Sequence, residues 1–206
     1  MQMMKGLFIK DILVLRQQWV AYAMMSVMWL VFGFMNESVA FFAGIMTMFT
    51  VTVPLNSIAY DEKARWDKYA LAMPIKRETL VLSKYLLAAA TAAVVFVLSG
   101  VVGVVMGEEL TESLMVSVGC MLSGMVIVSI ILPLIFKFGV EKGRLMIFVV
   151  AFLPAAAIFI ISKLHLQIPK DMNMDGLLFI FVAAAALVVA VSAMISMNIG
   201  KNKEYN

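Results

Sequence analysis

Six apolar stretches divide this chain, and each is close to the length that a helix needs to cross a membrane. Because the hydrocarbon core of a bilayer is about 30 Å thick and a helix rises about 1.5 Å per residue, about 20 residues suffice. The stretches predict spans at residues 19–35, 39–59, 85–106, 113–136, 145–162 and 177–199. The 206 residues leave room only for short connections, so we expect one all-α transmembrane domain over residues 1–206.

The composition supports a membrane protein. The chain is 64% hydrophobic and 14% charged, against about 45–50% and about 25% in soluble domains. We therefore expect a multi-pass protein of the cell membrane with the lipid bilayer as a partner, and no nucleic acid partner. Residues 1–18 are apolar but broken by charges, which is compatible with a helix lying in the interface before the first span.

The distribution of Lys and Arg predicts the orientation. If the N-terminus is cytoplasmic, 14 of the 16 basic residues lie on the inner side, and only Lys163 and Lys170 lie outside. Basic residues concentrate in cytoplasmic segments of membrane proteins. Both termini are therefore predicted to be cytoplasmic.

Residues 61–84 form a polar stretch between the second and third predicted spans. A short helix is predicted from Asp61 to Met73, because Pro74 disfavours helical continuation. Asp61 precedes Arg65 by four residues, the favourable order for a helical ion pair. One face of this helix would carry Trp66, Tyr69, Ala70 and Met73, and another would carry Asp61, Arg65 and Lys68.

Two polar motifs resemble those of a known family. The first comprises Tyr60-Asp61-Glu62, Trp66-Asp67-Lys68-Tyr69-Ala70, Met73-Pro74, Arg77 and Ser83-Lys84-Tyr85. The second comprises Pro133-Leu134, Lys137-Phe138-Gly139 and Lys142-Gly143-Arg144. Together they resemble small type-2 ABC permeases, the separate membrane subunits of bacterial ATP-driven exporters. That group includes exporters of phenol-soluble modulins and of bacteriocins or lantibiotics, and the resemblance covers the whole chain.

The resemblance implies roles for both motifs. Segment 61–84 would be a cytoplasmic coupling element that contacts an ATPase through Asp61, Glu62, Arg65, Trp66, Lys68, Tyr69, Met73, Pro74 and Arg77. A second, weaker contact would involve Lys137, Gly139, Glu141, Lys142 and Arg144. Two alternatives stay open: the aromatic side chains could simply sit at the lipid headgroups, and the second basic patch could serve only to fix the topology.

Energy for transport must come from another protein. The predicted spans carry essentially no ionisable residue away from their ends, which argues against an ion-coupled transporter. The chain also lacks the G-x-x-x-x-G-K-[ST] phosphate loop, and its single His and single Cys cannot build a metal site. We expect no enzymatic activity and no bound cofactor, with ATP and Mg²⁺ held by two copies of a separate ATPase.

Prolines and small residues occur inside the predicted spans. Pro54, Pro133 and Pro154 are expected to kink their helices, either as flex points or as static bends. Small residues recur every four positions and predict close helix packing, within one subunit or between subunits: Ser99, Gly103 and Gly107; Cys120 and Gly124; Ser192, Ser196 and Gly200.

The resemblance implies a function in export. The chain would be the permease subunit that moves amphipathic or hydrophobic peptides or antimicrobials out of the cell, paired with an identical or different second permease. The alternative is a membrane protein that does not transport but sequesters antimicrobial peptides or anchors a partner.

Overall fold

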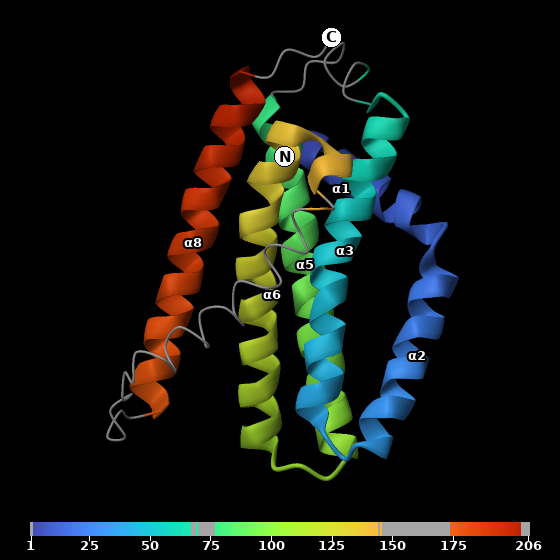
Figure 1. Ribbon diagram of the computed structural model, residues 1–206, viewed down its shortest axis with the longest axis vertical. Helices are drawn as coiled ribbons and strands as arrows, with labels where there is room; N and C mark the ends of the chain where they lie inside the picture. Colours follow the sequence, from blue (N-terminus) through green and yellow to red (C-terminus); the bar gives the residue numbers. More distant parts are fainter. Residues whose placement is uncertain (1, 67–68, 70–76, 144, 146–173, 203–206) are drawn as a thin grey trace.

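The computed structural model describes residues 2–66, 69, 77–143, 145 and 174–202, and Figure 1 labels the helices named below. Their bounds are α1 Gln2–Arg16, α2 Trp19–Met35, α3 Val39–Lys63, α5 Arg77–Val105, α6 Leu110–Phe138 and α8 Met174–Asn202. The prediction of an all-helical protein is confirmed for these residues.

Four helices, α3, α5, α6 and α8, are long and apolar enough to cross a membrane. The α1–α2 pair, bent by 68°, would count as a fifth crossing if it is one broken span. The chain is therefore a multi-pass membrane protein. The helix α2 covers the residues of the first predicted span, whereas the fifth, 145–162, lies outside the described residues apart from Leu145. The count of six spans stays a prediction.

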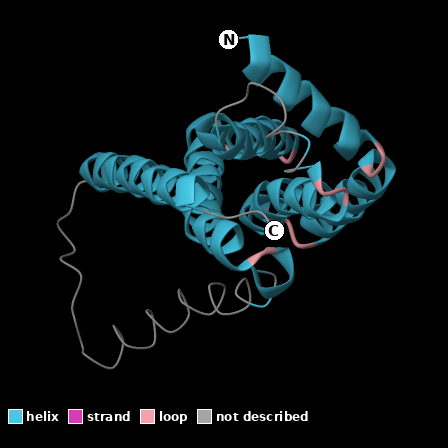
Figure 2. Cartoon of the chain, turned by 90° about the horizontal axis from the view of Figure 1, so that it is seen from above, coloured by secondary structure: helices cyan, strands magenta, loops and turns pink. Residues whose placement is uncertain are grey.

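The helix pairs α2/α3 and α5/α6 run antiparallel, because only a few residues connect the two helices of each pair (Figure 1). Ser38 caps the start of α3 by accepting the Phe41 N–H at 3.3 Å. Gly107, with φ of +83°, makes the turn between α5 and α6. We call the end of the bundle where α3 finishes at Lys63 and α6 at Phe138 the α1 end, because α1 contacts Asp61 and Lys84 there; Figure 2 shows α1, which starts at the N label, along one side of the bundle.

The helix α3 lies at the centre, against both α5 and α6, while α2 and α8 lie at the two edges (Figure 1). The close approach of neighbouring helices depends on two of the predicted small residues. A Cβ on Gly103 would come within 1.9 Å of Ser113 Oγ, and one on Gly124 within 3.0 Å of Thr47 Cγ2. These glycines therefore pack helices within the subunit, as small residues do where lipid supplies no hydrophobic driving force.

Pro133 lies inside α6 and leaves a backbone carbonyl free for a hydrogen bond with α8. A helical proline leaves the carbonyl four residues earlier without its N–H donor. That carbonyl, on Ser129, accepts a hydrogen bond from Ser192 Oγ of α8 instead. Pro54 lies inside α3, and Pro154 lies outside the described residues. The expected kinks stay predictions, but Pro133 shows how a neighbouring hydroxyl satisfies the backbone of a proline-containing span.

Candidate functional site

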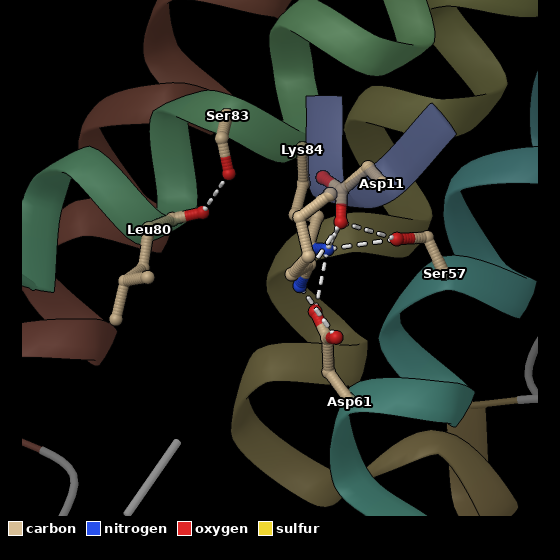
Figure 3. A network of polar contacts seen from close by, with 7 residues as sticks. Asp11, Ser57, Asp61, Leu80, Ser83 and Lys84 are labelled. Carbon is tan, nitrogen blue, oxygen red and sulfur yellow. Dashed lines mark hydrogen bonds and ion pairs between the residues drawn. The ribbon is translucent and has the colours of Figure 1, made fainter. Parts of the chain in front are cut away.

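A cluster of charged side chains joins α1, α3 and α5 at the α1 end (Figure 3). Lys84 Nζ of α5 contacts Asp11 Oδ1 of α1 at 2.8 Å and Asp61 Oδ2 of α3 at 2.6 Å, and donates to Ser57 Oγ at 2.8 Å. Lys10 Nζ contacts the other Asp61 oxygen, also at 2.6 Å. We call Lys10, Asp11, Ser57, Asp61 and Lys84 the ion cluster.

The ion cluster is largely shielded from solvent. Asp11 and Ser57 are fully buried, and Lys84 keeps only 6% of its surface exposed. Charges this deep are tolerated when they are paired and hydrogen-bonded. The two lysines balance the two aspartates, so the cluster is formally neutral. It holds α1 against the bundle, because Asp11 is the α1 side chain that both Lys84 and Ser57 contact.

The predicted ion pair between Asp61 and Arg65 is wrong. The helix α3 continues through Asp61 and ends at Lys63, so no new helix begins at Asp61. Arg65 then adopts a positive φ of +51°, which breaks the helical register that would bring the two side chains together. Asp61 pairs with Lys10 and Lys84 instead.

Sequence reasoning also missed Lys84 as a site residue, although it belongs to the first motif. A signal for it existed. Ser57 and Asp61 are four residues apart and share one face of a helix, and Lys84 is a lone charge at the start of an apolar run. The helix expected before the first span is present as α1.

A second contact brings the two predicted motifs together. Glu62 Oε2, in the last turn of α3, accepts the Val140 N–H at 3.0 Å, just after α6 ends. Gly139 makes this turn with φ of +82°, and a Cβ there would lie 3.1 Å from Glu62 Oε1. Residues that are 78 apart in sequence thus share one hydrogen bond.

A polar cleft of about 620 Å³ lies beside this contact. We call it the α3–α6 cleft, and its lining includes Tyr60, Lys63, Glu141 and Lys142 as well as Glu62 and Gly139. Gln18, between α1 and α2, forms part of the wall and donates to Tyr60 OH at 2.7 Å. The cleft therefore touches the α1–α2 corner, the end of α3 and the end of α6.

Residues 6–201 match the model of a family described as ABC-2 family transporter protein. The chain belongs to this family. Comparisons with curated proteins and with solved structures found no match. The chain is thus the permease subunit of an ABC transporter, and ABC-2 permeases generally work with an ATPase subunit and dimerise.

The structure separates the two aromatic residues that were predicted to face the ATPase of this ABC-2 permease. Tyr69 is 63% exposed, whereas Trp66 is partly buried and its ring lies 4.9 Å from Lys10 Nζ, in a cation–π contact with α1. Tyr69 is the more accessible of the two aromatic side chains, and Trp66 contacts a member of the ion cluster.

The remaining predicted coupling residues of the permease divide between described and undescribed parts. Arg65, Lys137, Glu141 and Lys142 are exposed at the α1 end. Arg77 begins α5. The residues outside the described part are Lys68, Met73, Pro74 and Arg144.

Proposed function

We propose that this permease subunit exports amphipathic or hydrophobic peptides across the cell membrane, driven by a separate ATPase that docks at the α1 end. The observation that carries the proposal is the Glu62–Val140 hydrogen bond. It joins the two stretches whose sequences resemble peptide and bacteriocin exporters, so both lie at one end of an ABC-2 permease.

The proposed docking surface is the α3–α6 cleft with the exposed side chains around it. The surface offers both charges and an aromatic anchor: Lys63, Arg65, Tyr69, Lys137, Glu141 and Lys142. Exposed charges set the register of a partner, while a buried aromatic residue supplies most of the binding energy. The α1 end would face the cytoplasm, where the ATPase holds ATP and Mg²⁺.

The ion cluster supplies a route from that surface into the bundle. Glu62, at the cleft, directly follows Asp61, and Asp61 pairs with Lys84 of α5 and with Lys10 of α1. A movement of the end of α3 would therefore be transmitted to both α1 and α5. In the proposed exporter, two such permeases, identical or different, and two ATPases form the complex.

The proposal is tested with the full permease and a candidate ABC ATPase, which is sought among the open reading frames beside its gene. The two proteins are coexpressed, purified in mild detergent and reconstituted in liposomes. We expect copurification, and ATP hydrolysis that rises when an amphipathic peptide is added. Peptide binding without ATPase copurification would contradict the proposal and favour sequestration. ATPase binding without peptide stimulation would contradict the assignment of the cargo.

A further inference from the structure

A second cavity, distinct from the α3–α6 cleft, opens between α1, α2, α3 and α5. It has a volume of about 500 Å³, within the range of pockets that hold small molecules. The faces of α2 and α5 that line it repeat the same spacing. Trp19, Tyr22 and Ser26 come from α2, and Thr91, Val94 and Leu98 from α5. We call this cavity the α2–α5 groove.

The shape of the groove follows from the helical spacing. Residues three and seven apart lie on one helix face, and seven residues rise about 10 Å. The groove therefore runs for about that length along α2 and α5. Phe49 and Val53 of α3 form its floor, and Ile12 and Leu15 of α1 close the end nearest the α1 end.

The hydroxyl groups in the walls are already hydrogen-bonded. Ser26 Oγ donates to the Tyr22 carbonyl at 2.8 Å, and Thr91 Oγ1 donates to the Ala88 carbonyl at 2.9 Å. The Tyr22 hydroxyl accepts a hydrogen bond from Asn56 Nδ2 at 2.7 Å. Along its length the groove consequently offers a largely apolar surface whose three hydroxyl groups are already hydrogen-bonded.

Arg16 is the exception. It is the last residue of α1, it lines the groove at the α1 end and it is exposed. No carboxylate in the described part of the chain lies within salt-bridge distance of its guanidinium. A guanidinium is always charged and presents several N–H donors in a fork that fits a phosphate.

We propose that the α2–α5 groove binds a membrane lipid with an anionic phosphate headgroup. The apolar walls would hold an acyl chain along α2 and α5, and Arg16 would bind the phosphate at the α1 end. A membrane-spanning chain is surrounded by such molecules, and the groove combines an apolar channel with one unpaired cation at its mouth. The proposal does not depend on the cargo of the transporter or on its ATPase.

Trp19 provides a direct readout, because it lines the groove and is 63% exposed. The full chain with Trp29→Phe and Trp66→Phe keeps Trp19 as its single tryptophan, which is excited at wavelengths where the five tyrosines do not absorb. It is reconstituted in phosphatidylcholine vesicles containing a minority of phosphatidylglycerol, with bromine on the acyl chains of one lipid or the other. Per molecule of lipid, brominated phosphatidylglycerol should quench Trp19 about fivefold more strongly, the preference that one Arg near an anionic lipid provides.

Matched variants separate headgroup binding from general lipid contact. Arg16→Gln should abolish the preference, whereas Lys63→Gln, which removes an exposed cation outside the groove, should keep it. Val94→Phe should reduce quenching by narrowing the groove. Val97→Phe should not, since Val97 is equally exposed, at 57%, but does not line the groove.

Three results would overturn the proposal. Equal quenching by the two lipids would show that Arg16 selects no headgroup. A preference that survives Arg16→Gln would place the selection elsewhere. Protection of Trp19 from both lipids would show that another protein segment, such as a second copy, fills the groove. A variant with Trp29 as its only tryptophan, which lies outside the groove, measures the background preference.

Discussion

Lys84 is the side chain that links three helices, α1, α3 and α5. Its ammonium group has three N–H donors, and the structure gives it three acceptors, from Asp11, Ser57 and Asp61. Each acceptor belongs to α1 or α3, while Lys84 itself belongs to α5. Its energetic role follows from burial, since paired buried charges are tolerated and an unpaired one is costly.

Replacing Lys84 with Met should destabilise the protein strongly. The variant keeps the length of the side chain but leaves Asp11 and Asp61 with Lys10 as their remaining cation. Loss of one partner of a buried pair costs about 3–5 kcal/mol. Thermal unfolding in detergent would measure the loss. Lys142→Met, at an exposed position, should leave the unfolding temperature unchanged, and adding Asp11→Asn to Lys84→Met should restore part of the stability. An unchanged unfolding temperature for Lys84→Met would contradict the ion cluster.

A second prediction at this scale concerns Gly139. With φ of 82° and ψ of 169°, it occupies a backbone region that is essentially open only to glycine. Gly139→Ala should cost about 1–3 kcal/mol and disturb the Glu62–Val140 contact. Gly119→Ala is the control, because it lies inside α6 with no atom within 4 Å of the added methyl group. Chemical denaturation would measure the free energy of unfolding of both variants. Equal values would argue against a strained turn at Gly139.

At the scale of elements, the lengths of the apolar stretches made the helices predictable from the sequence. A membrane requires about 20 apolar residues per helix, so α2, α3, α5, α6 and α8 each overlap a predicted span. The partners of the charged residues were not predictable in the same way. Local spacing favoured Arg65 as the partner of Asp61, but Arg65 lies beyond the end of α3, and Lys84 reaches Asp61 only through the packing of α5 on α3.

The proposed coupling element yields a comparison between Tyr69 and Trp66. If the ATPase docks here, Tyr69→Ala should weaken its binding roughly thirtyfold, because truncating an aromatic anchor costs about 2 kcal/mol. Trp66→Ala should act first on α1, through the lost contact with Lys10. Copurification of the ATPase measures the first effect, and limited proteolysis of α1 measures the second. The opposite ranking, with Trp66→Ala alone abolishing ATPase binding, would restore Trp66 as the anchor.

At the scale of the whole molecule, the basic residues predict which end faces the cytoplasm. Glu141 is exposed at the α1 end and Glu109 is exposed at the other. In a Cys120→Ala background, which removes the single native thiol, a cysteine at Glu141 should react only with cytoplasmic reagents. A cysteine at Glu109 should react only with external ones. Labelling of the Glu109 position from the cytoplasm would invert the predicted orientation.

The ion cluster also sets an order for biosynthesis. Asp11 leaves the ribosome 73 residues before Lys84, one of its cation partners. A nascent chain that ends before residue 84 has Lys10, from α1 itself, but lacks the second cation that contacts Asp11 in the described part of the structure. The helix α1 therefore cannot complete its docking until the start of α5 has been synthesised. Until then α1 lacks the buried ion pair with Lys84 that holds it against α5.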